Sequence, residues 1–197
     1  MMLHPATVHF AMVLPLVASL LGVLYILTRN KGVSTLSLWA TFLAAVAMGI
    51  AWYTGSEAGP AVYDYLSEEG QAKLLEHKRL GLYLALSLCA IFLLQILGSK
   101  LGKFIIETLA IALLLTATLV TFVQGNDGGE IVYEHGMPFK AFMMEEIIND
   151  AVADAQEAQS ADEKVEIYEE AVESIKMHAK DVDKLYSSPT IEEAPQQ

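Results

Sequence analysis

The sequence predicts an all-α protein in which a bundle of four transmembrane helices is followed by a soluble, acidic helical hairpin. Its 197 residues are 54% hydrophobic, which is above the usual share for a soluble chain. It contains four apolar runs, each close to the roughly 20 residues that a helix needs to span a bilayer. Residues 1–129 hold seven acids and seven bases, so the net charge of −12 belongs to residues 130–197, which hold 17 acids and five lysines. This shift in composition marks a change of solvent.

The four spans are expected at residues 8–28, 36–54, 80–98 and 104–124, within a transmembrane domain of residues 1–137. The first span does not read as a cleaved signal peptide, because no lysine or arginine precedes it. A glycine-rich cluster at residues 125–129 is expected to end the fourth span. Trp39 and Trp52 lie at opposite ends of the second span and fit either interfacial anchoring or core packing.

The short loops predict the orientation in the membrane. Arg29 and Lys31 lie between the first two spans, Lys100 and Lys103 lie between the last two, and neither loop contains an acid. Because cytoplasmic loops are enriched in lysine and arginine, both turns are expected on the cytoplasmic side. The N-terminus, the loop at residues 55–79 and the tail then lie outside. In a bacterium this is an inner-membrane protein with both termini in the periplasm.

The tail is expected to form an antiparallel helical hairpin over residues 138–188, followed by a disordered stretch at 189–197. Ser160 and Glu163 have the spacing of a capping box, which predicts the start of the second helix. Each helix carries an apolar stripe, which packs either within the hairpin or against a partner helix or a second copy. The acidic charge argues against a nucleic-acid partner. The stripes are Met144, Ile148, Ala151, Ala155 and Ala158 in the first helix, and Val165, Tyr168, Val172, Ile175, Ala179, Val182 and Tyr186 in the second.

Four of the five histidines, His4, His9, His77 and His135, fall at the same outer face in this topology. Ionisable groups at membrane depth are costly and usually face a bundle interior or a cavity. The first and third helices of such a bundle lie on a diagonal of about 11 to 14 Å, which lets two imidazoles face a plate-like cofactor. His9 and His77 suit this arrangement best, as axial ligands of haem iron. His4 is expected to precede the first helix and, with His135, to form a second pair or a support.

Two other interpretations remain open. Neutral imidazole also binds copper, iron and zinc, so the histidines can form a metal-binding cluster. Alternatively, the histidines are interfacial and the protein is a non-catalytic scaffold that recruits a partner through its tail. One acid lies inside a span: Glu107 is expected to pair with Lys103, four residues away, in preference to serving as a proton relay.

Several motifs resemble those of a bacterial membrane family called domain of unknown function 2231. They are HPATVHF at residues 4–10, Thr54 with Gly55, His77, and GGEIVYEHG at residues 128–136. The resemblance covers residues 1–137 and leaves the acidic tail outside. It implies a four-helix inner-membrane protein whose shared histidines resemble the ligands of small b-type cytochromes.

The leading hypothesis is a membrane protein that binds haem b on the periplasmic side and transfers electrons between a quinone or membrane partner and a periplasmic redox protein. This hypothesis favours an electron-transfer subunit over a stand-alone enzyme, and no catalytic residue is assigned. The sequence shows no hydrolytic triad, phosphate-binding loop or zinc-hydrolase motif.

Overall fold

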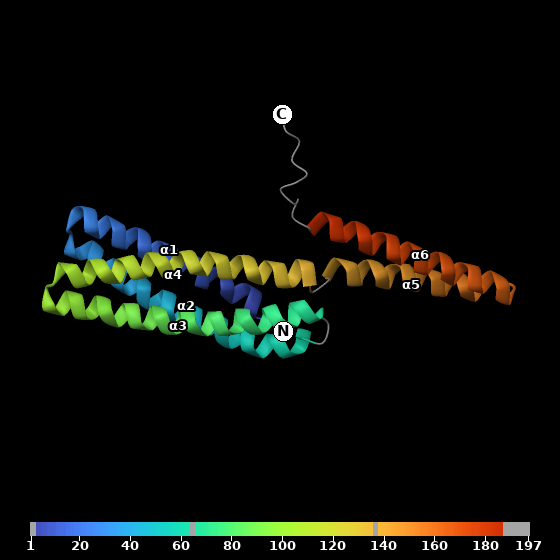
Figure 1. The fold of residues 1–197 in the computed structure, drawn as a ribbon, viewed down its shortest axis with the longest axis horizontal. Coiled ribbons are helices and arrows are strands. Elements are labelled where there is room, and N and C mark those ends of the chain that lie inside the picture. The colour runs from blue at the N-terminus through green and yellow to red at the C-terminus, as the bar shows by residue number, and fades with distance from the viewer. Residues whose placement is uncertain (1–2, 64–65, 136–137, 187–197) are drawn as a thin grey trace, which may run out of the picture. The chain divides into compact units, whose positions relative to one another are not determined.

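The computed structural model describes residues 3–63, 66–135 and 138–186. In these residues all regular elements are helices (Figure 1). The chain forms two compact units, residues 1–129 and 130–197. This confirms the expected fold class of four long apolar helices followed by two more. The helices are α1 (His4–Thr28), α2 (Lys31–Tyr63), α3 (Glu68–Leu101), α4 (Phe104–Glu130), the π-helix η1 (Ile131–His135), α5 (Pro138–Glu157) and α6 (Ala161–Tyr186).

Helices α1 to α4 form a bundle in which consecutive helices are neighbours. Helix α1 packs against α2, and α2 packs against α3. Helix α4 closes the ring, because Thr118 hydrogen-bonds Ser19 of α1 at 2.8 Å and Gln124 donates to the His77 carbonyl of α3 at 2.7 Å. Helices α1 and α3 are therefore diagonal to each other. Each of the four helices is long and apolar enough to cross a membrane.

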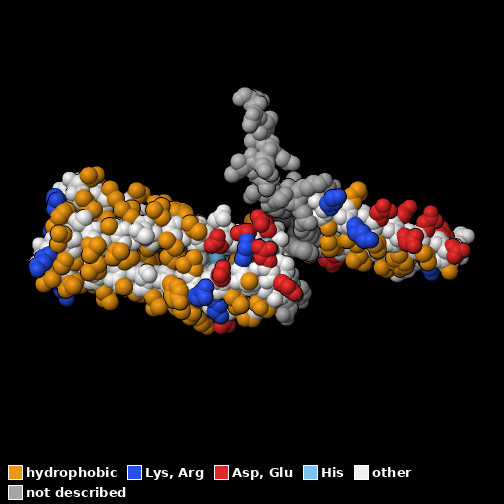
Figure 2. Space-filling view, viewed as in Figure 1, with side chains coloured by type: hydrophobic (Ala, Val, Ile, Leu, Met, Phe, Trp, Pro, Cys, Tyr) orange, Lys and Arg blue, Asp and Glu red, His pale blue; other side chains and the backbone are white. Residues whose placement is uncertain are grey.

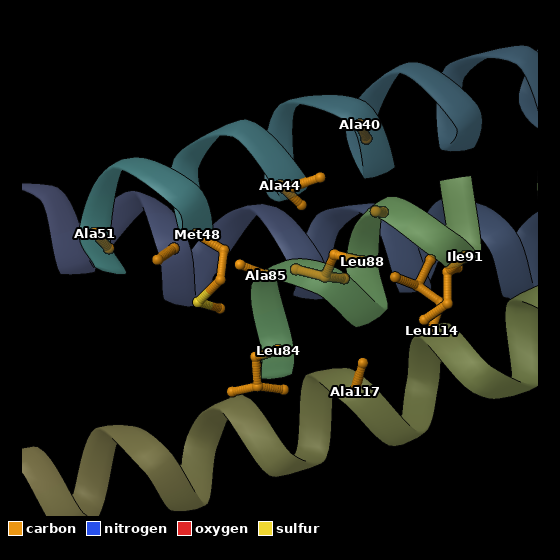
Figure 3. Packing of buried hydrophobic residues seen from close by; sticks show 13 residues of the cluster. Ala40, Ala44, Met48, Ala51, Leu84, Ala85, Leu88, Ile91, Leu114 and Ala117 are labelled. Atoms are coloured by element: carbon orange, nitrogen blue, oxygen red, sulfur yellow. The ribbon is translucent and has the colours of Figure 1, made fainter. Parts of the chain in front are cut away.

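Small side chains fill much of the space between these helices (Figure 3). Ala18 and Ala44 are fully buried beside the larger Leu88 and Leu114. Small residues let helix backbones approach closely, which is how helices associate where lipid removes the hydrophobic driving force. The outside of the bundle is covered by apolar side chains (Figure 2). Toward one end lysine and arginine are mixed with aspartate and glutamate, whereas at the other end lysine and arginine stand alone. We call the end where lysine and arginine stand alone the basic end, defined by Arg29, Lys31, Lys100 and Lys103. We call the opposite end of the bundle the histidine end, defined by His4 and His77.

The helices extend beyond the predicted spans. Helix α2 continues to Tyr63 and α3 begins at Glu68, so the loop expected at residues 55–79 is mostly helical. The start of α3 is well capped, because the Ser67 hydroxyl accepts a hydrogen bond from the Gly70 amide at 3.1 Å. Glu68 and Glu69 lie in the first turn, where their negative charges interact favourably with the positive end of the helix dipole. Local capping thus keeps a polar segment helical outside the apolar run.

The glycine cluster at residues 125–129 does not end the fourth helix, contrary to the prediction. Helix α4 continues to Glu130. A β-carbon at Gly125 would lie 2.8 Å from Met12, and one at Gly128 would lie 3.0 Å from the His77 ring. These neighbours occupy the space that a side chain would need. Tertiary packing therefore outweighs the poor helix propensity of glycine.

The buried carboxylate of Glu107 has a different partner from the one predicted. Its ion pair is with Lys31, at 3.0 Å, and not with Lys103. Lys31 is the first residue of α2, so the ion pair joins α2 to α4 through two residues that are 76 positions apart in the sequence. The spacing of four residues on one helix was not the deciding factor, because Glu107 faces the bundle interior and is only 3% exposed.

Helices α5 and α6 form the expected hairpin, but its contact surface differs from the predicted stripes. Ala151 and Ala155 of α5 are buried, as expected. In α6, Val165, Tyr168 and Val172 are exposed. An outward stripe of this kind leaves an apolar face available to a partner. The hairpin unit begins at residue 130, whereas the sequence placed the boundary at 137, and residues 189–197 lie outside the described residues.

The capping box of α6 is confirmed and gives a first testable prediction. The Ser160 hydroxyl accepts from the Glu163 amide at 3.1 Å, and the Glu163 carboxylate accepts from the Gln159 amide at 2.8 Å. Ser160→Ala should cost about 1 kcal/mol, which corresponds to about fivefold faster hydrogen exchange in the first turn of α6. Ser174→Ala, in the middle of the same helix, is the matched control and should leave this exchange unchanged. Equal exchange in both variants would contradict the cap.

Candidate functional site

His4 is the first residue of α1, not a residue that precedes the helix as the sequence suggested. Its ring lies against α2, where a β-carbon at Gly55 would be only 2.8 Å from the ring. The ring Nδ1 is 3.3 Å from the Thr54 hydroxyl. Thr7, one turn further along α1, hydrogen-bonds the same hydroxyl at 2.9 Å. Glycine and threonine of α2 together fix the position of the imidazole.

His77 lies in the third turn of α3, facing α4. Its ring is so close to α4 that a β-carbon at Gly128 would be 3.0 Å from its Cε1 atom. Its backbone carbonyl accepts the hydrogen bond from Gln124, which holds this turn of α3 to α4. The ring Nδ1 is buried and has no hydrogen-bond partner among the described residues. Glu76, the neighbouring acid, is turned outward and lies 3.9 Å from Arg79.

The structure places His4 and His77 close enough for their charges to interact. The two imidazoles interact electrostatically although they come from diagonal helices, and Asp127 of α4 also interacts with His77. Both rings are partly buried. The pair therefore lies in the interior of the bundle, at the histidine end.

His9 does not join this pair. Its side chain is exposed on the outside of α1, and its Nδ1 lies 2.7 Å from the Pro5 carbonyl. His4 and His9 are five residues apart, about 140° around a helix, so only one of them can face the bundle interior. The structure turns His4 inward. Of the pair that spacing favoured, the structure turns His77 toward the bundle and leaves His9 exposed.

His135 and Glu134 lie in η1, at the start of the second unit, and Glu130 is the last residue of α4 directly before them. The ligand atoms of these three residues all lie within 4.8 Å of one another. A π-helix bonds residues five apart, which places residues 130 and 135 on the same side, where an α-helix would separate them. The three side chains thus form a separate group of possible metal ligands.

A family model described as a predicted membrane protein, domain of unknown function 2231 (DUF2231), matches residues 1–141. The chain belongs to this family. The match covers the whole four-helix bundle and ends in α5, so α6 lies outside it. No curated protein and no solved structure matches the chain.

This DUF2231 protein contains further polar groups at the histidine end: Trp52, which the sequence suggested as an interfacial or core residue, and two residues that the sequence did not single out, Ser56 and Gln124. Trp52 Nε1, Ser56 Oγ and Gln124 Oε1 are buried and lack hydrogen-bond partners within the described part of the chain. Gln124 and Trp52 meet beside Gly81, whose β-carbon would lie 3.4 and 3.7 Å from them. Buried polar atoms without partners are costly and usually indicate a bound molecule or ordered water. Gln124, a polar residue at the end of the predicted fourth span, was the sequence feature that could have indicated this polar group.

Proposed function

We propose that this membrane protein binds haem b and transfers electrons, with His4 and His77 as the axial ligands. The observation that carries the proposal is that two imidazoles from the diagonal helices α1 and α3 are partly buried at the same end of the bundle. His4 packs against Gly55 of α2 and His77 against Gly128 of α4, and their charges are close enough to interact. Imidazoles inside a helical bundle in a membrane are costly and are usually kept for function. Two histidines from facing helices are also a suitable donor set for haem iron.

The hydrogen bonds around the rings favour metal binding. The Thr54 hydroxyl donates to the Ile50 carbonyl at 3.0 Å, so its oxygen is left to accept from Nδ1–H of His4. This tautomer leaves the lone pair on Nε2 of His4 for a metal. His77 has one buried ring nitrogen, Nδ1, that no described residue hydrogen-bonds.

Two glycines let the imidazole rings pack closely against helix backbones. A β-carbon would lie only 2.8 Å from the His4 ring at Gly55 and 3.0 Å from the His77 ring at Gly128. Glycine permits this close approach, so each ring is held against a neighbouring helix. Haem b supplies a one-electron iron couple when it is bound. The protein's own residues orient the two imidazoles, through Thr54 on one side and through the Gln124 contact with α3 on the other.

The basic end is proposed to face the cytoplasm of a bacterium, because Arg29, Lys31, Lys100 and Lys103 gather there. The histidine end and both termini then lie on the periplasmic side of the inner membrane. The proposed electron donors and acceptors are a quinone or membrane partner and a periplasmic redox protein. The acidic charge of the second unit favours a basic partner protein. The exposed apolar stripe of α6 is an alternative contact surface, for a partner helix or for a second copy of the chain.

The direct test is an optical spectrum of the full chain in mild detergent, oxidised and then reduced with dithionite, with the haem quantified as pyridine haemochrome. The expected result is a Soret band with sharp α and β bands on reduction, at about one haem per chain. A colourless protein after expression with added haem would overturn the proposal.

A second candidate function, binding of a divalent metal ion, is favoured by the group of Glu130, Glu134 and His135. One imidazole and two carboxylates are ligands suited to zinc or iron. Copper is a further candidate for the histidine.

Zinc binding at this group can be measured by titrating the full chain with Zn²⁺ alone in a calorimeter. His135→Ala should weaken the binding at least about tenfold, because it removes the nitrogen ligand. His178→Ala is the matched control, since His178 lies in α6 and its Nδ1 contacts the Ser174 carbonyl at 2.8 Å. Equal zinc affinity in the two variants would exclude this group as the site.

A further inference from the structure

The basic end of the bundle contains a second buried polar cluster, separate from the histidines. The Tyr25 hydroxyl donates to the Glu107 carboxylate. The Lys31 ammonium donates to both carboxylate oxygens, at 3.0 and 3.1 Å, and to the Tyr25 hydroxyl at 3.1 Å. Tyr25 and Glu107 are 2% and 3% exposed. The carboxylate is thus held inside the bundle by one residue of α1 and one of α2.

The three members differ in their access to water. The side chain of Lys31 is 64% exposed, whereas that of Glu107 is 4% exposed. The ion pair therefore has one member in solvent and one in the interior. Glu107 packs closely against α3 at Gly98. A β-carbon at Gly98 would lie 2.9 Å from the Glu107 backbone nitrogen and from its side chain, so a larger residue there would not leave room for the buried carboxylate.

A small cavity adjoins the carboxylate. Its volume is about 20 Å³, which is enough for a water molecule. Its polar lining comes from seven residues: Tyr25, Ser34, Thr35, Ser37, Gln95, Ser99 and Glu107. Two of the lining residues, Thr35 and Ser99, are exposed, so the cavity leads inward from the surface of the bundle.

Gln95 is the observation that points to an occupant of this cavity. It is 7% exposed, lines the cavity, and its side-chain Oε1 has no hydrogen-bond partner among the described residues. A buried acceptor without a donor costs about 1 to 3 kcal/mol. A water in the cavity would donate to Gln95 and also reach the carboxylate or the hydroxyls. A metal cation is disfavoured, because the Lys31 ammonium already occupies both carboxylate oxygens.

We propose that Glu107 is a proton-exchange site that is reached from the basic end through a water held by Gln95. A proton passes from solvent through this water to the carboxylate, which becomes a neutral carboxylic acid. Lys31 keeps its proton and its charge, and its exposed ammonium is then hydrated by solvent. Tyr25 keeps its proton as well, so one proton enters and no other group changes charge.

The surrounding charges are compatible with reversible exchange. Tyr25 from α1 and Lys31 from α2 contact the carboxylate directly, and no charged residue of α3 lines the cavity. The Arg29 guanidinium lies 3.1 Å from the centre of the Phe104 ring, at the start of α4. Lys100 and Lys103 lie at the adjoining turn. A purely structural ion pair would need neither the cavity nor the unpartnered glutamine.

The test is infrared difference spectroscopy of the full chain in detergent, between neutral and acidic pH, in H₂O and in D₂O. The exposed carboxylates also protonate on acidification, so the expected result is a separate carbonyl component of a protonated carboxyl group, displaced from theirs by its buried surroundings. This component should appear on acidification and shift in D₂O. Glu107→Gln should remove this band. Glu76→Gln is the matched control, because that side chain is 74% exposed, and it should retain the band. A band that persists in Glu107→Gln, or no such band at any pH, would overturn the proposal.

Gln95→Leu tests the water without touching the ion pair, which also covers the case in which Glu107→Gln does not fold. This variant should retain the band but shift it in D₂O at least tenfold more slowly than the unmodified protein. Labelling the glutamates with ¹³C in the carboxyl group identifies the band as a glutamate in the unmodified chain. A shift as fast as in the unmodified protein would rule out the proposed route. This test does not depend on haem, so its failure is distinct from a failure of the proposed function.

Discussion

His77→Ala is expected to lose nearly all bound haem, and His4→Ala is expected to do the same. Each variant removes one of the two imidazoles proposed as axial ligands. A single remaining imidazole holds the iron on one side only, and loss of a ligand or its support typically costs tenfold to a hundredfold in affinity. The haem content of the purified variants, measured as pyridine haemochrome per chain, should fall from about one to about a tenth or less.

The matched control is His9→Ala, because His9 lies on the same helix as His4 but is exposed. Its haem content should equal that of the unmodified protein. Circular dichroism and size-exclusion chromatography establish that the variants are folded. Loss of haem in His9→Ala with retention in His4→Ala would restore the pairing predicted from sequence spacing and refute the pairing proposed from the geometry.

The position of the spans could be predicted from sequence, because a membrane imposes one requirement that short windows can read: about 20 apolar residues per helix. The ends of the helices could not, because they depend on capping and on packing outside the apolar runs. Ser67 and the two glutamates after it start α3 well before the apolar segment. Gly128 stays helical because His77 fills the space beside it.

The candidate site was predicted only in part, because local sequence patterns indicate residue types but not which side chains face the bundle interior. The expected positions of the spans singled out four histidines. Which of His4 and His9 faces the bundle interior depended on where α1 begins and how it is turned, and these are set by packing. The partner of Glu107 required tertiary information, since Lys31 is distant in sequence. Lys103, at a favourable helical spacing, was the only partner that local rules offered.

The second prediction with a large effect concerns the glycine beside His77. Gly128→Leu is expected to weaken haem binding by about tenfold to a hundredfold. The new side chain must occupy space that the His77 ring fills, because even a β-carbon would lie 3.0 Å from its Cε1 atom. Overpacking of this kind costs about 1 to 3 kcal/mol, which corresponds to that loss in affinity. Titration of the haem-free protein with haem, followed at the Soret band, measures the change.

Gly129→Leu is the control that separates packing from backbone effects. No atom lies within 4 Å of a β-carbon at Gly129, although this residue follows Gly128 in the same helix. The substitution should leave haem affinity unchanged and should add up to about 1 kcal/mol of helix stability, because glycine is a poor helix former. If both variants lost haem equally, the glycines would be needed for backbone flexibility, and the close packing of His77 on α4 would no longer support its role as a ligand.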